Sequence, residues 1–195
     1  MVDGLPVRDE RVRQALLDVP REAFVASDPY ADSPQPIGAG QTISAPHMVA
    51  IMAEALDVRP GMRVLEVGGG SGYHAAVLAR LADPGVVVSV EYVPELAARA
   101  RDTLRRLGIA NVEVVEGDGS VGHAPRAPYD RISVAAGAPR VPPPLVAQLA
   151  AGGQMLIPVG PLDVQTLVRV HADGREEPMM AVRFVPLLGE HGWRT

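Results

Sequence analysis

The chain has 195 residues, of which 47% are hydrophobic, 21% charged and 4% aromatic, and its formal net charge is −5. This length and apolar content predict one sizeable core, so we expect a single domain over residues 1–195. The negative charge argues against non-specific binding to nucleic acid or anionic membranes. Cysteine is absent, which excludes disulfides and thiolate chemistry, and the five histidines lack metal-ligand spacing, so we expect no metal site.

The first residues of the sequence do not suggest secretion. The first residues lack the basic region and apolar core of a secretion signal. No apolar run approaches the ~20 residues of a membrane-spanning helix. We therefore expect a soluble cytoplasmic protein, and we take a monomer as the expected state.

Residues 1–60 predict two helices separated by a loop. Residues 8–18 place apolar side chains at helical spacing and stop before Pro20. Residues 26–44 are rich in Pro, Ser, Gly and Asp and predict a long ordered loop, a feature that favours a functional role in a compact chain. A second helix is expected to begin at Pro46.

Residues 61–160 alternate between strand and helix patterns, and residues 161–195 do not. The alternation predicts right-handed crossovers and a doubly wound, Rossmann-like α/β fold, with a mainly parallel sheet and helices on both faces. Residues 164–171 and 180–187 predict a terminal antiparallel pair of strands. The expected strands of the core are 62–67, 86–91, 112–116, 130–136 and 154–159, and its expected helices are 72–82, 94–107 and 142–150.

A glycine-rich turn follows the first strand of this core. Gly68, Gly70 and Gly72 give a G-x-G-x-G spacing between an apolar strand and a helix start, which lets the backbone approach a nucleotide-like ligand closely. Tyr73 stands where dinucleotide-binding turns need Gly or Ala, so the turn favours S-adenosylmethionine over NAD. Tyr73 also breaks the G-x-S-x-G pattern of α/β-hydrolases.

Two acidic residues follow the next two strands. Glu91 could accept hydrogen bonds from both ribose hydroxyls of a nucleoside, and Asp118 could accept one from an adenine amino group. Each alone is also compatible with a solvated strand end or an ordinary turn. Because parallel strand ends converge on one crevice, the order of glycine turn, acid and acid is the pattern of class I S-adenosylmethionine-dependent methyltransferases.

The chain resembles the protein-L-isoaspartate (D-aspartate) O-methyltransferase family over nearly its full length. The resemblance depends on segments 19–25, 37–48, 115–119, 127–132, 152–160 and 184–189, together with the glycine-rich turn. The T-I-S-x-P run within 37–48 separates this family from other methyltransferases. Two positions depart from the family pattern: Gly69 replaces the usual Thr or Ser, and Gly137 the more usual Ala.

The resemblance implies that S-adenosylmethionine methylates the free carboxylate of L-isoaspartyl residues in damaged proteins or peptides, leaving S-adenosylhomocysteine and starting repair through a succinimide. It implies that Ser44 is the active-site hydroxyl that contacts the substrate carboxylate. The other implied roles are cofactor binding by Gly68, Gly70, Gly72, Glu91, Asp118 and Gly119, and substrate binding by Thr42, Ile43, His47 and Val185.

Other interpretations stay open from the residues themselves. Thr42 and Ser44 could cap the helix that begins at Pro46, and His47 could be an ordinary surface residue of its first turn. The same carboxyl chemistry could tailor a ribosomally made peptide instead of repairing proteins. A module that binds the cofactor without transferring methyl, and an NAD-dependent reductase, are further alternatives.

Overall fold

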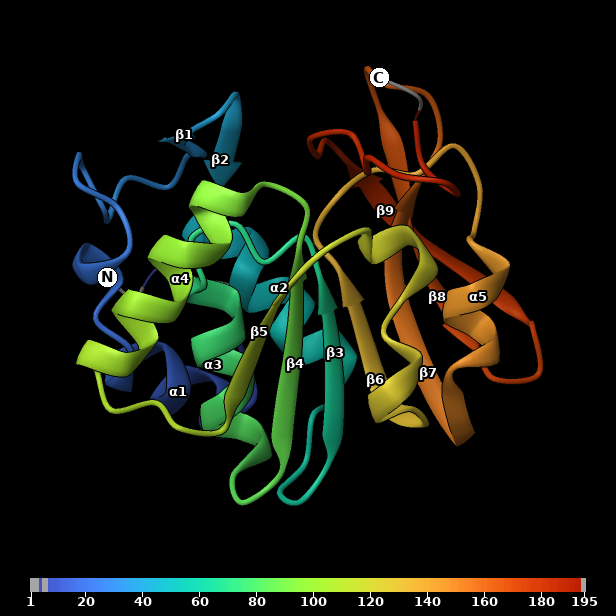
Figure 1. Cartoon of the computed structure of the whole chain (residues 1–195), viewed down its shortest axis with the longest axis horizontal. Coiled ribbons are helices and arrows are strands. Elements are labelled where there is room, and N and C mark those ends of the chain that lie inside the picture. Colours follow the sequence, from blue (N-terminus) through green and yellow to red (C-terminus); the bar gives the residue numbers. More distant parts are fainter. Residues whose placement is uncertain (1–3, 5–6, 194–195) are drawn as a thin grey trace.

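The structure, a computed structural model, describes residue 4 and residues 7–193. A seven-stranded sheet in the order β5-β4-β3-β6-β7-β8-β9 runs through the molecule (Figure 1). Strands β3 to β7 are parallel, and β8 and β9 add an antiparallel pair at one edge, which confirms the predicted Rossmann-like α/β fold. The strands are β3 (Arg63–Val67), β4 (Val86–Glu91), β5 (Val112–Glu116), β6 (Tyr129–Val134), β7 (Leu149–Val159), β8 (Gln165–His171) and β9 (Glu176–Val182).

Helices cover both faces of the sheet, and their distribution follows from right-handed crossovers. The chain moves from β3 through β4 to β5 in one direction, so the two connecting helices lie on the same face, and the opposite course from β6 to β7 places its helix on the other. The N-terminal helices complete the first face. The elements of the first face are α1 (Glu10–Asp18), α2 (Pro46–Leu56), α3 (Tyr73–Ala82) and α4 (Pro94–Arg106), and α5 (Pro143–Ala147) lies on the second.

The sheet separates two hydrophobic cores, because neighbouring residues of a strand point to opposite faces. Val64 of β3 belongs to the core under the four helices, whereas Leu65 belongs to the core on the other face. Helix α3 is buried on nearly every side, and only Arg80 is exposed in it. Strands that are covered on both faces explain the almost continuous apolar runs of the sequence.

Several boundaries differ from those predicted, among them the start of β7, which lies at Leu149 instead of 154. The expected loop 26–44 contains a hairpin of β1 (Gln35–Gly38) and β2 (Gln41–Ile43). Helix α5 ends at Ala147, before the predicted 150, because Leu149 already pairs with Tyr129 in β7. The last strand is 176–182 instead of 180–187, because a tight turn brings Glu176 directly opposite Val170.

Residues 183–188 leave the sheet and fold back over the ends of its strands. The backbone N–H of Gly137 donates to the Val185 carbonyl at 2.7 Å, and the N–H of Leu187 donates to the Gly137 carbonyl at 2.8 Å. Trp193 Nε1 reaches the same Gly137 carbonyl at 3.0 Å. None of the helices in the described part of the chain has the length and apolar character needed to cross a membrane.

Candidate active site

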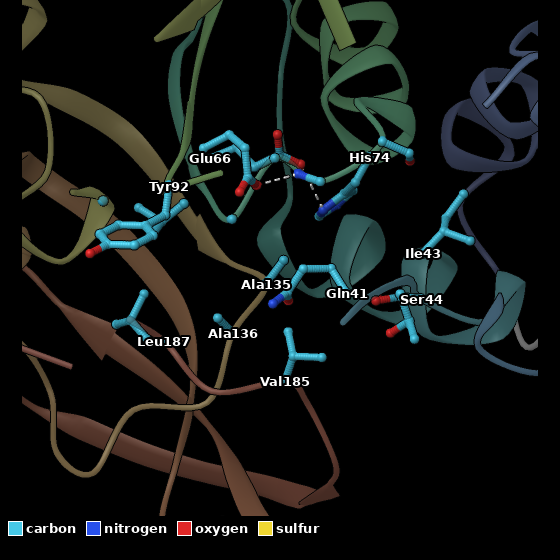
Figure 2. A pocket seen from close by; sticks show the side chains of 18 of the residues that line it. Gln41, Ile43, Ser44, Glu66, His74, Tyr92, Ala135, Ala136, Val185 and Leu187 are labelled. Carbon is cyan, nitrogen blue, oxygen red and sulfur yellow. Dashed lines mark hydrogen bonds and ion pairs between the residues drawn. The ribbon is translucent and has the colours of Figure 1, made fainter. Parts of the chain in front are cut away.

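The strand order reverses between β3 and β6, and this is where a doubly wound sheet opens a crevice beyond its carboxyl ends. We call the hollow at this point the inner cavity. Figure 2 shows Glu66 and His74 on one side of it, Ile43 and Ser44 on another, and Val185 and Leu187 facing them. Its lining comes from the glycine-rich turn, the end of β4, strand β2, and the segments 135–136 and 185–188.

Backbone hydrogen bonds hold the glycine-rich turn against the end of β4. The N–H groups of Gly68 and Gly69 donate to the Val90 carbonyl at 2.9 and 3.3 Å. Gly68 and Gly70 line the inner cavity and have φ values of 85° and 54°, which side chains with a Cβ rarely adopt. Gly72 lies behind the cavity, where a Cβ would come 3.1 Å from the Ala100 Cβ of α4. Its small size therefore allows two helices to pack closely.

Glu91 is 5% exposed and lines the inner cavity. Its carboxylate accepts the N–H of Gly70 at 2.7 Å through Oε2 and the N–H of Val93 at 2.8 Å through Oε1. These bonds join the glycine-rich turn to the start of α4. Since each carboxylate oxygen has two lone pairs, Glu91 can still accept hydrogen bonds from a ligand.

A buried polar cluster lies beneath the same turn. Glu66 is completely buried, and its Oε2 accepts a hydrogen bond from Ser89 Oγ. Its Oε1 lies 3.5 Å from His74 Nδ1, yet neither Glu66 Oε1 nor His74 Nε2 has a hydrogen-bond partner among the described residues. Burial raises the pKa of Glu66 to about 8 and lowers the pKa of His74 to about 4. Burial therefore disfavours the charged form of both side chains.

Ser44 stands where the inner cavity meets a second hollow, which we call the outer groove. The two hollows share Thr42, Ser44, Ala135 and Val185. Helix α2 is capped by Ala45 without a side-chain hydrogen bond, so the structure does not support a capping role for Thr42 or Ser44. The outer groove is lined further by Pro34, Ala45, His47, Met48 and residues 180–184.

His47 and Asp118 lie outside the lining of the inner cavity. His47 lies in the outer groove, and Asp32 Oδ1 accepts its backbone N–H at 3.0 Å and contacts its Nδ1 at 2.8 Å. The Asp118 carboxylate accepts Ser120 N–H at 2.8 Å, Ser120 Oγ at 2.6 Å and Glu190 N–H at 2.8 Å. Asp118 thus anchors the C-terminal segment.

Most of the predicted site residues meet in one place. Gly119 lines the inner cavity, and a Cβ there would lie 2.6 Å from Val67 Cγ1, so a side chain does not fit. The predicted residues that share the inner cavity are Ser44, Thr42, Ile43, Gly68, Gly70, Glu91, Gly119 and Val185, and those outside its lining are Gly72, His47 and Asp118.

Several residues that line the inner cavity have no role predicted from the sequence, among them Gln41, Glu66, His74, Tyr92 and Leu187. Glu66 had a signal that could have revealed it, because it is a charged residue in the middle of an apolar strand of a parallel sheet. Such a residue is buried and needs a partner or a purpose. His74 carries no comparable local signal.

Comparison with known proteins agrees with this geometry. A model of the family "Protein-L-isoaspartate(D-aspartate) O-methyltransferase (PCMT)" matches residues 4–192. The protein-L-isoaspartate O-methyltransferase of Methanothrix thermoacetophila is 54% identical over 191 residues, which cover 95% of this chain and 91% of the relative. That of Methanopyrus kandleri is 54% identical over 198 residues, which cover 96% of this chain and 88% of the relative.

Solved structures give the same picture. A protein-L-isoaspartate O-methyltransferase from Plasmodium falciparum, in complex with S-adenosyl-L-homocysteine, matches with a TM-score of 0.85 and 28% identity, over 93% of this chain and 92% of that one. A second protein-L-isoaspartate O-methyltransferase matches with a TM-score of 0.84 and 32% identity, over 94% of this chain and 62% of the other.

Proposed function

Because this chain belongs to the protein-L-isoaspartate O-methyltransferase family, we propose that it transfers the methyl group of S-adenosylmethionine to the free carboxylate of L-isoaspartyl residues. Its substrates would be damaged proteins and peptides. The observation that carries this proposal is the meeting of the inner cavity and the outer groove at Ser44. A methyl donor in the first and a carboxylate in the second would be brought together beside one hydroxyl.

The residues of the inner cavity suit S-adenosylmethionine, which supplies a methyl group on a positively charged sulfur when bound. Gly68 and Gly70 leave room for a close backbone approach, and the remaining lone pairs of Glu91 suit ribose hydroxyls. The unpartnered Oε1 of Glu66 suits the ammonium group of the same molecule. These three features support a cofactor site.

The adenine end of the site would lie beside Gly119, which lines the inner cavity at a position with no room for a side chain of its own. We propose that Asp118 shapes this end through its bonds to Ser120 and Glu190, which hold the 119–121 turn and the C-terminal segment together. Gly72 would contribute by letting α3 pack closely on α4, so that the turn before it keeps its shape.

We propose that Ser44 Oγ donates a hydrogen bond to the isoaspartyl carboxylate, and that Thr42, Ile43, His47 and Val185 line the path of the peptide. A free carboxyl has a pKa near ~4 and is ionised at neutral pH, so no general base is needed. Catalysis then depends on alignment of the carboxylate oxygen, the methyl carbon and the sulfur, an effect that can reach about 7–11 kcal/mol.

The later chemistry needs no group of this chain. The backbone nitrogen of the following residue attacks the methyl ester, methanol leaves, and a succinimide forms. Hydrolysis of the succinimide returns part of the material to normal aspartate. The relatives quoted above favour neither peptide tailoring nor a module without catalysis.

The test is a methyl-transfer assay with labelled S-adenosylmethionine and two versions of one peptide, isoaspartyl and aspartyl. We expect base-labile label in the isoaspartyl version only. In parallel, S-adenosylhomocysteine should raise the melting temperature and NAD should not, because only a ligand of the folded state stabilises it. Equal labelling of both peptides, or no shift with S-adenosylhomocysteine, would contradict the proposal.

We also propose that the protein acts as a monomer in the cytoplasm and without nucleic acid. One chain supplies every residue described above for the two hollows, and the formal net charge of −5 disfavours a polyanionic partner. Light scattering after gel filtration would test the monomer, since a dimer at micromolar concentration would contradict it.

A further inference from the structure

Arg21 stands first among the largest side chains that are fully buried in the described part of the chain. It begins the short 3-10 turn Arg21–Ala23 after Pro20. Its exposure is 0%, and among the described residues no carboxylate lies within ion-pair distance of it, although Asp32 attracts the guanidinium from farther away. Burial lowers the pKa of this guanidinium below its usual value. Because burying a cation without a paired anion costs free energy, stability alone gives no reason for an arginine here.

The contacts of Arg21 connect three separate segments. Nη2 donates to the Ser44 carbonyl at 2.6 Å, and Nε donates to the Pro29 carbonyl at 2.7 Å. The guanidinium carbon lies 4.8 Å from the ring centroid of Tyr73, a cation–π contact. One planar group therefore touches the 26–33 loop, the residue that follows β2 and the first residue of α3.

Tyr73 ties this group to the glycine-rich turn. It is 1% exposed, it follows Gly72 directly, and its ring packs edge-on against Phe24 with centroids 5.6 Å apart. The position of the guanidinium over the ring is thus fixed relative to the inner cavity. Arg21 itself lines neither the inner cavity nor the outer groove.

A second contact holds the other side of Ser44. Asp32, in the same loop as Pro29, accepts the backbone N–H of His47 at 3.0 Å. The chain around Ser44 is therefore held by Arg21 at the Ser44 carbonyl and by Asp32 three residues later. Asp32 lies in the loop to which Arg21 is hydrogen-bonded at the Pro29 carbonyl, so Arg21 also supports the Asp32 contact.

We propose that Arg21 is a positioning residue for methyl transfer, which holds the Ser44 backbone against the first turn of α3 and so sets the distance from the Ser44 hydroxyl to the cofactor turn. This inference rests on the proposed function and on the proposed role of Ser44. Misplacement of a reacting group by about 1 Å can cost on the order of a hundredfold in rate. A lysine cannot replace the planar fork that reaches two carbonyls and one ring.

The first experiment is Arg21→Lys, assayed with an isoaspartyl peptide. We expect kcat to fall about 10- to 100-fold, while KM for the peptide and Kd for S-adenosylhomocysteine change less than about threefold. The matched control is Arg131→Lys. Arg131 Nε donates to two carbonyls, Leu56 at 2.7 Å and Asp57 at 3.3 Å, at the opposite end of the sheet. This control should lower Tm and leave kcat unchanged.

The second experiment repeats Arg21→Lys in a Ser44→Ala background. If Arg21 acts through Ser44, the second change should lower kcat by less than about threefold there, because contacting residues are not additive. Should Arg21→Lys fold poorly, Arg21→Gln removes the buried charge, keeps an amide donor and should show the same deficit in kcat.

The outcomes distinguish the proposed function, the role of Ser44 and the role of Arg21. An inactive wild-type protein would refute the proposed function, and a fully active Ser44→Ala would refute the role of Ser44. If both hold, the positioning role of Arg21 is overturned by either of two results: a lower Tm with unchanged kcat, or the same fold-loss in both backgrounds.

Discussion

The inner cavity has two walls that are built in different ways. The wall formed by the glycine-rich turn and Glu91 comes from one continuous βαβ unit, and its hydrogen bonds join β3 to the neighbouring β4. The wall around Ser44 and Val185 is assembled from distant segments, joined by Arg21 on one side and Gly137 on the other. The first wall is therefore a local property of the sequence, and the second exists only in the folded chain. Substitutions in the first wall should change the affinity for the cofactor, whereas substitutions in the second wall should change kcat.

Ser44→Ala tests the second wall and should have the largest effect. We expect kcat to fall about a hundredfold, the usual cost of losing one aligned hydrogen-bond donor, with the Kd of S-adenosylhomocysteine unchanged. Steady-state kinetics and calorimetry would measure the two. Ser33→Ala is the control, because Ser33 is exposed, its Oγ accepts a hydrogen bond from Gln35 Nε2 at 2.9 Å, and it lies outside the described lining of both hollows. Full activity in Ser44→Ala would refute the assignment of turnover to the second wall.

Glu91→Gln tests the first wall. An amide has one acceptor oxygen, so it cannot accept from Gly70, Val93 and a ribose as the carboxylate can. Losing charged hydrogen bonds costs about 1.5–3 kcal/mol, so the Kd of S-adenosylhomocysteine should rise at least tenfold. The kcat at saturating cofactor should stay within about threefold of the wild-type value. Isothermal titration would show the change, and exposed Glu95→Gln should leave Kd as it is. A lower kcat with unchanged Kd would reverse the assignment.

The double variant Gly69→Ser with Ser89→Ala tests whether a hydroxyl at position 69 of the first wall can replace the hydroxyl of Ser89. A Cβ at position 69 would overlap Ser89 Oγ, so Gly69→Ser alone should cost about 1–3 kcal/mol of unfolding free energy. Ser89→Ala alone removes the donor to Glu66. The double variant should recover most of the loss, because a Cβ at 69 lies 3.5 Å from Glu66 Oε2 and its hydroxyl can replace that of Ser89. Urea denaturation would measure all four proteins, and strict additivity would count against the exchange.

Glu66→Gln should change stability in a way that depends on pH. The pKa of Glu66 is raised by burial from 4.5 to about 8, so the folded state keeps a proton that the unfolded state loses, and stability falls as pH rises from about 4.5 to about 8. His74 acts in the opposite sense: its pKa is lowered from 6.5 to about 4, so stability falls as pH drops through that window. Removing the Glu66 term should raise Tm at pH 8 relative to wild type, by about 2–4 °C for each kcal/mol of this linkage, and change it little at pH 4.5. The same difference in Tm between the variant and the wild type at both pH values would contradict this.

The same contrast explains how much the sequence could predict. The alternation of strands and helices, the glycine-rich turn and Glu91 follow from patterns within a few residues of each other, so periodicity and turn chemistry were enough to predict them. The orientation of the Asp118 carboxylate could not be predicted, because its partner Glu190 lies 72 positions away in the sequence. The burial of Arg21 has no local signal either, since its partners come from three other segments. Resemblance to a family pointed to Ser44, but only the fold shows what holds it.

The wall contributed by residues 185–188 has a consequence for how the protein is made. On the ribosome the glycine-rich turn, Glu91 and Ser44 all emerge first, whereas this stretch is synthesised later than every other part of the lining. A nascent chain that has reached only residue 180 can form the parallel strands and yet has no complete place for its ligand. Methylation competence should therefore arrive only once residues 185–188 have been synthesised, after the parallel strands β3 to β7.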